Sequence, residues 1–209
     1  MRKARRTCPP RTKRGRRVGI LGGTFNPIHM GHLVLAEQAR GLLRLEKVIF
    51  VPTNLPPHKR PSLLVPAQER YHMVAKALKS NPCFEVSNLE LTRGGVSYSV
   101  ETLRKFKSIF RHSALYFIVG SDFLKEFSGW RDIDKLSKIC KFVIAARPGY
   151  PLGRLPGNMQ AIKVSALDIS STDIRKRIRT EKSIRYLVPE EVRKYILKKR
   201  LYRVRIKNT

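Results

Sequence analysis

The chain has 209 residues, 42% of them hydrophobic and 28% charged, which is the composition of a globular protein with room for one good core. No apolar run approaches the ~20 residues that a membrane-spanning helix needs. These values exclude a mostly disordered chain and a chain built on membrane-spanning helices.

The 44 Lys and Arg against 15 Asp and Glu give a formal net charge of +29, and most of the excess lies at the two ends. Residues 1–17 contain nine basic and no acidic residues, and residues 171–209 contain fourteen against four. The moderately basic middle suits an enzyme for anionic substrates. The ends favour nonspecific contact with polyanions such as RNA, DNA or an anionic membrane surface. Because no nucleic-acid-binding motif accompanies the charge, we interpret this contact as a side property.

The cysteines are odd in number and far apart in the chain: Cys8, Cys83 and Cys140. They predict neither a disulfide framework nor a zinc site, which indicates a reducing, cytoplasmic setting. The basic residues 1–16 are not followed by the apolar core of a secretory signal, so we expect a disordered arm there. Residues 17–203 are expected to form a single domain with a helical C-terminal part, and residues 204–209 a tail.

The motif that organises the chain follows its first apolar run. Residues 18–21 predict a buried strand, Gly22-Gly23 break it, and residues 24–27 turn the chain into His29-Met30-Gly31-His32. An amphipathic helix is predicted from this point, so the two histidines, three residues apart, share one helical face. Open α/β sheets bind ligands where a helix begins at the carboxyl end of a strand, and free backbone N–H groups there attract anions.

This motif favours a phosphate-binding site. The glycines let the backbone approach a phosphate, and the imidazoles can donate hydrogen bonds to phosphoryl oxygens. It is neither a Walker loop nor a dinucleotide fingerprint, since GxxxxGK[ST] and GxGxxG are absent. Two alternatives are a plain glycine turn with two surface histidines and a metal pair at His29 and His32. The metal pair would lack any nearby Cys or carboxylate ligand.

A substrate contact is predicted in the loop after the second strand. Residues 47–51 are apolar and predict this strand, and residues 52–59 form a proline-stiffened loop at its carboxyl end. His58 and Lys59 either meet a phosphate or are ordinary surface residues.

The middle of the chain continues with a helix over 66–78 and a short strand over 84–86. A polar, glycine-containing segment then leads into a helix over 100–106, for which Ser97 or Ser99 is a candidate N-cap. Capping is the structural interpretation of these hydroxyls, and it is compatible with a binding role.

The next strand, over 114–119, ends in the turn Gly120-Ser121-Asp122. An acidic side chain at a strand end suits the hydroxyls of a ribose, as in other nucleotide-binding folds. The alternative is that Asp122 caps a helix over 123–127. Trp130, the only tryptophan, lies beside Gly129 and is either a stacking platform or a core residue.

Two further strands are predicted over 140–145 and 160–164. They are followed by Ile169-Ser170-Ser171-Thr172-Asp173-Ile174-Arg175, which opens a basic helix. Hydroxyls and N–H groups at a helix N-terminus, with Arg175 one turn further, predict a second phosphate-binding site. The alternative is a capped, solvated helix. A last helix is predicted to start at Pro189-Glu190-Glu191.

Strands alternate with helices throughout, which predicts an α/β fold with a parallel sheet and right-handed crossovers. The turns at Gly22, Pro52 and Gly120 would then open on the same edge of the sheet. The sequence offers no convincing nucleophile. Its glycines, imidazoles, hydroxyls and guanidinium groups suit direct phosphoryl or nucleotidyl transfer, in which positioning and charge neutralisation supply the rate.

Taken together, these motifs resemble the bacterial nicotinate mononucleotide adenylyltransferases of the HxGH nucleotidyltransferase superfamily. GGTFNPIHMGH is similar to the superfamily signature GGTFxPxHxGH, and ISSTDIR is similar to its ISSTxxR motif. Arg93 to Leu103, Gly120 to Leu124 with Trp130, RPGY and LYR resemble further blocks of these enzymes. The likeness covers about Arg17 to Arg203.

The resemblance implies a Rossmann-like nucleotidyltransferase fold, a parallel sheet with helices on both faces. It also implies that AMP passes from ATP to nicotinate mononucleotide, giving deamido-NAD and pyrophosphate with Mg²⁺. The mononucleotide phosphate would attack the α-phosphorus in line, without a covalent enzyme intermediate. The number of subunits, including a homo-oligomer, stays open.

The resemblance also assigns roles to individual residues, and it implies no protein metal ligand. The catalytic residues would be His29, His32 and Arg175. The ATP-binding residues would be Gly22, Gly23, Thr24, Phe25, His29, His32, Gly120, Asp122, Ile169, Ser171, Thr172 and Arg175. The nicotinate mononucleotide-binding residues would be His58, Lys59, Ser97, Tyr98, Ser99, Trp130 and Arg131.

Three positions depart from the family pattern. Asn26 stands where Asp is common, Ser99 where Thr is usual, and Arg131 where an aromatic residue often follows the tryptophan. We hypothesise that Arg131 favours the acid substrate over the amide. The alternatives are an adenylyltransferase of the same fold acting on nicotinamide mononucleotide or phosphopantetheine, against which SYSVETL and Trp130 argue, and a basic nucleic-acid-binding protein.

Overall fold

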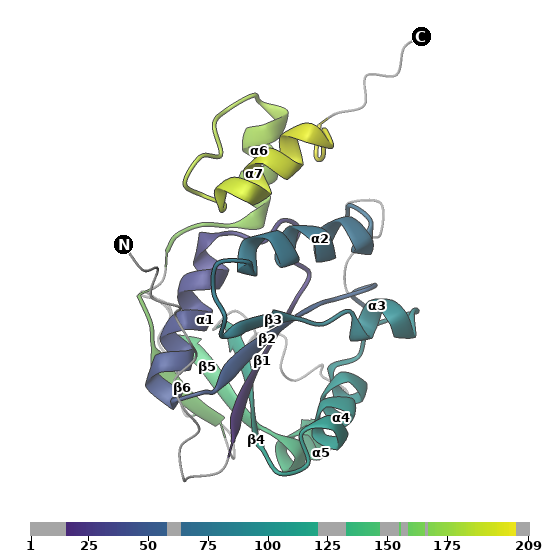
Figure 1. Ribbon diagram of the computed structural model, residues 1–209, viewed down its shortest axis with the longest axis vertical. Helices are drawn as coiled ribbons and strands as arrows, with labels where there is room; N and C mark the ends of the chain where they lie inside the picture. Colours follow the sequence, from purple (N-terminus) through teal and green to yellow (C-terminus); the bar gives the residue numbers. More distant parts are fainter. Residues whose placement is uncertain are drawn as a thin grey trace, which may run out of the picture.

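The computed structural model describes residues 16–57, 64–120, 133–146, 155, 159–165 and 167–203. Six parallel strands form one sheet in the order β3-β2-β1-β4-β5-β6, and every neighbouring pair is parallel (Figure 1). The strands are β1 Arg17–Gly23, β2 Lys47–Pro52, β3 Phe84–Val86, β4 Ala114–Gly120, β5 Lys141–Ala146 and β6 Met159–Lys163. The predicted parallel α/β sheet is confirmed.

Helices cover both faces of the sheet. They are α1 Met30–Leu43, α2 Ala67–Leu78, α3 Leu89–Arg93, α4 Ser99–Ile109, α5 Ile133–Ile139, α6 Ser171–Arg179 and α7 Glu190–Lys198. Helices α1 and α2 lie on one face and α3 to α5 on the other, and α6 and α7 lie together beyond α1 and α2 (Figure 1). This arrangement confirms the Rossmann-like fold with helices on both faces.

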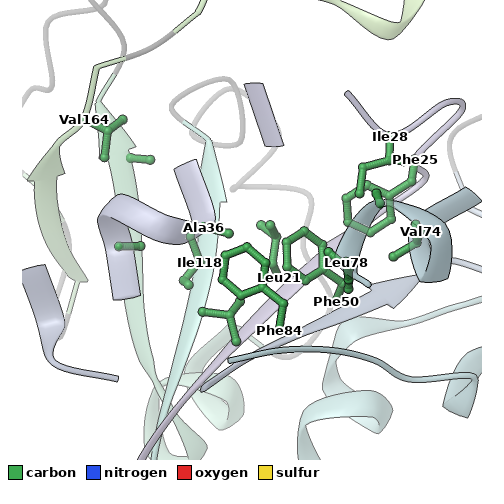
Figure 2. Packing of buried hydrophobic residues seen from close by; sticks show 14 of the residues in the cluster. Leu21, Phe25, Ile28, Ala36, Phe50, Val74, Leu78, Phe84, Ile118 and Val164 are labelled. Atoms are coloured by element: carbon green, nitrogen blue, oxygen red, sulfur yellow. The ribbon is translucent and has the colours of Figure 1, made fainter. Parts of the chain in front are cut away.

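Each face of the sheet buries its own apolar layer, because successive residues of a strand point to opposite faces. Leu21, Phe50 and Ile118 face α1 and α2, whereas Ile20 and Phe117 face α4 and α5. On the first face, a row of aromatic rings runs across the sheet (Figure 2): the ring centroids of Phe50 and Phe84 are 5.2 Å apart. The central strands are buried on both faces, which is why they read as continuous apolar runs.

The carboxyl ends of the strands meet at one edge, as predicted from the turns. Gly23 of β1 lies opposite Pro52 of β2, and β1 also pairs with β4, which ends at Gly120. The strand order reverses between β1 and β4, and a crevice at such a point is where open α/β sheets bind ligands. The fold therefore places the histidine motif, which follows β1, at this switch point.

Two local expectations are wrong. The N-cap of α4 is Tyr98, which makes no side-chain cap hydrogen bond, so neither Ser97 nor Ser99 caps this helix. Cys83 is disulfide-bonded, against the expectation of unpaired cysteines, whereas Cys140 is a buried thiol whose Sγ donates to the Leu136 carbonyl. Within the described residues, no helix is long and apolar enough to cross a membrane. The predicted arm, apart from Arg16, and the predicted tail lie outside the described residues.

Candidate active site

The loop between β1 and α1 is held by its own apolar side chains. Phe25, at a left-handed φ of 46°, is buried, as is Ile28. The Phe25 ring lies 5.9 Å from that of Phe50 on β2, near Val74 of α2 (Figure 2). A Cβ at position 23 would lie 3.0 Å from the Phe25 ring, so the ring would have to move by a few tenths of an ångström to admit a side chain there. The aromatic residue of the motif thus fixes the loop that leads to the histidines.

His29 and His32 lie together at the start of α1. His29 is the N-cap and only 4% exposed, and its ring centroid is 3.7 Å from that of His32. The backbone N–H of His29 donates to Nδ1 of His32 at 3.2 Å. The ring proton of His32 therefore sits on Nε2, from which it can be donated to a phosphoryl oxygen. The prediction that the two imidazoles share one face is confirmed.

Gly31 makes this arrangement possible. A Cβ at position 31 would lie 3.1 Å from Nδ1 and 3.2 Å from Cε1 of His29, closer than ordinary van der Waals contact. The glycine of the HMGH motif therefore leaves the space that the ring of His29 occupies.

The first turn of α1 is less available to an anion than the sequence predicts. The Met30 N–H donates to the Leu187 carbonyl at 2.9 Å, and the His32 N–H donates to the His29 carbonyl at 3.0 Å. Two of the backbone donors of this helix start are thus engaged. The imidazole side chains are the better candidates for phosphate contact here.

Helix α6 is bonded directly to the β1–α1 loop. The Ser171 hydroxyl donates to the Pro27 carbonyl at 2.8 Å, and Nη1 of Arg175 donates to the Asn26 carbonyl at 2.9 Å. Nη2 of Arg175 donates to Oγ1 of Thr172 at 3.2 Å, which leaves the Thr172 hydroxyl proton to be donated elsewhere. Two motifs more than 140 residues apart in the sequence therefore meet at one place.

Burial and neighbouring side chains shift the pKa of Arg175, which lies beside the histidine loop. Partial burial lowers the pKa of Arg175, Tyr202 nearby raises it, and Arg179 lowers it. A guanidinium stays protonated under all ordinary conditions, so Arg175 supplies a fixed positive charge beside the histidine loop.

Sequence reasoning missed Arg70 of α2, which at 1% exposure is the largest fully buried side chain among the residues that the structure describes. Its guanidinium donates to four backbone carbonyls of the loops around the site. The acceptors are Thr24 at 2.8 Å, Thr53 at 2.6 Å, Asn54 at 2.8 Å and Val65 at 3.1 Å. The available signal was its spacing: Arg70 lies in register with the buried residues Val74, Ala77 and Leu78 of the same helix.

The segment before α4 lies against the loop after β2. The Ser97 N–H donates to the Leu55 carbonyl at 2.9 Å, and the Ser97 hydroxyl accepts from the Asn54 N–H at 3.0 Å. The next residues, Tyr98 and Ser99, start α4. The structure thus joins the predicted mononucleotide-binding segment to the same strand edge as the histidine motif.

Comparison with known proteins shows the family to which the chain belongs. Residues 20–177 match the cytidylyltransferase-like family model. The chain is 47% identical over 202 residues to a probable nicotinate-nucleotide adenylyltransferase of Moorella thermoacetica, covering 91% of this chain and 93% of that protein. A relative of the same name from Thermus thermophilus is 44% identical over 187 residues, covering 90% of this chain and 100% of that protein. The chain is a nicotinate-nucleotide adenylyltransferase family member.

Solved structures agree on the fold of the family. A Plasmodium falciparum nicotinic acid mononucleotide adenylyltransferase, complexed with NaAD, superposes with a TM-score of 0.76 at 21% identity, covering 90% of this chain and 97% of that chain. A putative nicotinate-nucleotide adenylyltransferase from Vibrio parahaemolyticus gives a TM-score of 0.66 at 20% identity, covering 90% and 95%. The family resemblance predicted from the motifs is confirmed.

The family motifs are only partly covered by the structure. Gly22 and Gly23 end β1 and Gly120 ends β4, at the carboxyl edge of the sheet, and Ile169 directly precedes Ser170, the N-cap of α6. The other predicted contacts lie outside the described residues: His58, Lys59, Asp122, Trp130 and Arg131. Among the residues that the structure describes, no group of three His, Cys, Asp or Glu side chains comes together to hold a metal ion.

Proposed function

We propose that this protein transfers AMP from ATP to nicotinate mononucleotide, giving deamido-NAD and pyrophosphate in NAD biosynthesis. One observation carries the proposal: the paired imidazoles of His29 and His32 lie at the switch point of the sheet, and the loop that precedes them is hydrogen-bonded to Arg175 of α6. Relatives more than 40% identical over nearly the whole chain bear the name of this activity.

The reaction needs no group of the protein to form a bond with substrate. An oxygen of the mononucleotide phosphate attacks the α-phosphorus of ATP, the bond from this phosphorus to the bridging oxygen breaks, and pyrophosphate leaves with the electron pair. The role of the protein is to hold the two anions in line and to neutralise the charge that develops.

We propose a separate part in this role for each of the described side chains of the site. We assign the Nε2–H of His32 to an oxygen of the transferring phosphate, since its Nδ1 is engaged with the His29 backbone. His29 and Arg175 stabilise charge on the transferring and leaving phosphates, and Thr172 donates its hydroxyl proton to the triphosphate. Ser171 acts differently from the family expectation, because its hydroxyl donates to the Pro27 carbonyl and ties α6 to the loop.

The remaining contacts are proposed from the sequence motifs alone. Asp122 would bind the adenylate ribose, and Trp130 would stack on the pyridine ring. Backbone groups near Ser99, together with Arg131, would receive the nicotinate carboxylate. His58 and Lys59 would meet the mononucleotide phosphate.

Mg²⁺ is proposed to enter as part of the substrate MgATP. Magnesium commonly keeps several waters and binds through substrate phosphates rather than in an all-protein site. The described part of the chain offers cationic and neutral donors around the histidine loop and no cluster of acidic ligands, which fits a metal held by the phosphates.

Two further properties are proposed, a cytoplasmic setting and contact with polyanions. A cytoplasmic setting, where ATP is available, agrees with the substrates, whereas the disulfide of Cys83 is unusual for that compartment. The basic ends favour weak, nonspecific contact with polyanions. Removing residues 1–16 should weaken retention on a polyanion column in low salt and leave transferase activity intact.

The proposal is tested by measuring pyrophosphate release with MgATP and one of three acceptors: nicotinate mononucleotide, nicotinamide mononucleotide or phosphopantetheine. We expect nicotinate mononucleotide to be the best acceptor. Preference for the amide would overturn the proposed carboxylate site, and preference for phosphopantetheine would overturn the acceptor class. Release with none of the three would refute the proposed reaction.

A further inference from the structure

Arg70 connects the segments that surround the site. Nη1 bonds the Thr24 carbonyl in the β1–α1 loop and the Thr53 carbonyl just after β2. Nη2 bonds the Asn54 carbonyl, and Nε bonds the Val65 carbonyl, where the chain returns to α2. One side chain thus joins the histidine loop to both ends of the segment that links β2 with α2.

The same segments are joined by their N–H groups. The Thr53 N–H donates to the Gly23 carbonyl at 2.9 Å, and the Val65 N–H donates to Oδ1 of Asn26 at 3.4 Å. The Asn54 N–H donates to the Ser97 hydroxyl. The Thr53 carbonyl belongs to the same peptide unit as the Asn54 N–H, so a shift of this carbonyl would also move the bond to Ser97. Thr53 and Val65 each have a carbonyl that Arg70 holds and an N–H that is bonded to Gly23 or Asn26.

A guanidinium is the only side-chain group that can make these four bonds at once. Its five N–H groups are spread in a rigid plane, whereas a lysine has three donors on one nitrogen. Burial lowers the pKa of Arg70, and the nearby Tyr202 and Glu90 raise it. A guanidinium stays protonated under all ordinary conditions, so Arg70 carries its positive charge inside the fold. Among the ion pairs of the described residues none includes Arg70, and the carbonyl dipoles are its direct partners.

We propose that Arg70 is a positioning residue of the transfer reaction. It sets the histidine loop, through Thr24, at a fixed place relative to the loop after β2 and the Ser97 segment, so that the two substrates meet in line. Arg70 acts through these backbone segments and is not assigned a contact with substrate. The inference rests on the proposed function, because the reaction is the one that the positioning serves.

The test compares R70K with R104K, a matched change at an exposed arginine of α4. Both are assayed at a temperature where circular dichroism shows the protein fully folded. We expect kcat of R70K to fall by about 10- to 100-fold, since small displacements of reacting groups have effects of this size. We expect R104K to equal the wild type.

Hydrogen exchange separates positioning from a general loss of stability. In R70K, the amides of Thr53, Asn54 and Val65 should exchange at least about tenfold faster, while those of Ile20 and Phe117 in the central strands stay unchanged. Faster exchange throughout the sheet, unchanged exchange at the three loop amides, or a wild-type kcat in folded R70K would each overturn the inference.

A second variant covers the case in which R70K does not fold. In R70A, millimolar guanidinium should restore folding and at least part of kcat, and methylammonium should restore neither. A chain that stays unfolded in both variants, with guanidinium present, overturns the inference. A wild-type protein that forms no deamido-NAD refutes the proposed function instead, and the exchange experiment then still decides whether Arg70 fixes the two loops.

Discussion

Replacing Gly31 by Ala should slow the reaction while leaving the fold intact. The new Cβ would lie 3.1 Å from Nδ1 of His29, whereas comfortable contact begins at about 3.5 Å. The His29 ring must then move by roughly 0.4 Å, which is close to the tolerance of about 0.5 Å for a working catalytic arrangement. We expect kcat to fall by about tenfold, or ~1.4 kcal/mol in the activation free energy. Pyrophosphate release under saturating MgATP and nicotinate mononucleotide measures this effect.

The matched control is Gly41→Ala in the same helix, where the added Cβ has no atom within 4 Å. Alanine is favoured over glycine in a helix by up to ~1 kcal/mol, so this variant should keep its kcat and gain about 2–4 °C in Tm. In Gly31→Ala, the same helical gain is offset by crowding that costs roughly 1–3 kcal/mol. A Gly31→Ala enzyme with wild-type kcat would refute the view that this glycine serves the position of His29.

Three further outcomes are expected. Arg175→Lys should raise KM for ATP and lower kcat, each by roughly tenfold, because a lysine offers one nitrogen in place of the two that bond the Asn26 carbonyl and Thr172; Arg177→Lys, whose side chain is 41% exposed on the same helix, should change neither kinetic constant. Burial raises the pKa of the Cys140 thiol to about 12, so iodoacetamide at about pH 8 should leave Cys140 unmodified in the native protein and label it in denaturant, as mass spectrometry would show. Burial and the hydrogen bond to Glu69 raise the pKa of Tyr195 from 10 to about 12, so its contribution to stability is complete below pH 10 and is lost as the pH rises to about 12. The free energies of unfolding of wild type and Tyr195→Phe, measured with urea, should differ below pH 10 and converge between pH 10 and about 12, and a difference that stays constant over that interval would contradict the assignment.

The sheet and its ligand-binding edge could be predicted because both leave local marks in the sequence. Strands buried on both faces read as apolar runs, and the turns that end them carry glycine or proline, as at Gly22 and Pro52. The spacing of His29 and His32 follows from helix geometry alone. These features depend on neighbours in the chain, and they were correct.

The features of the site that the sequence did not predict depend on contacts between residues that are far apart in the chain. Nothing near Met30 indicates that its N–H is taken by the Leu187 carbonyl, so the sequence overestimates the anion-binding capacity of α1. Arg70 reads as an ordinary charged residue of an amphipathic helix, because its four acceptors are backbone carbonyls with no sequence signature. The hydroxyl of Ser171 likewise looks available for phosphate until its bond to Pro27 is known.

Because α6 is bonded to the β1–α1 loop, the site depends on residues that are synthesised late in translation. The histidine loop leaves the ribosome early, but Ser171 and Arg175, which bond its carbonyls, are translated more than 140 residues later. A growing chain can therefore complete its six-stranded sheet before the proposed triphosphate site exists. An incomplete chain, or one cut short by a premature stop codon after β6, would lack Ser171 and Arg175 and with them the proposed triphosphate site.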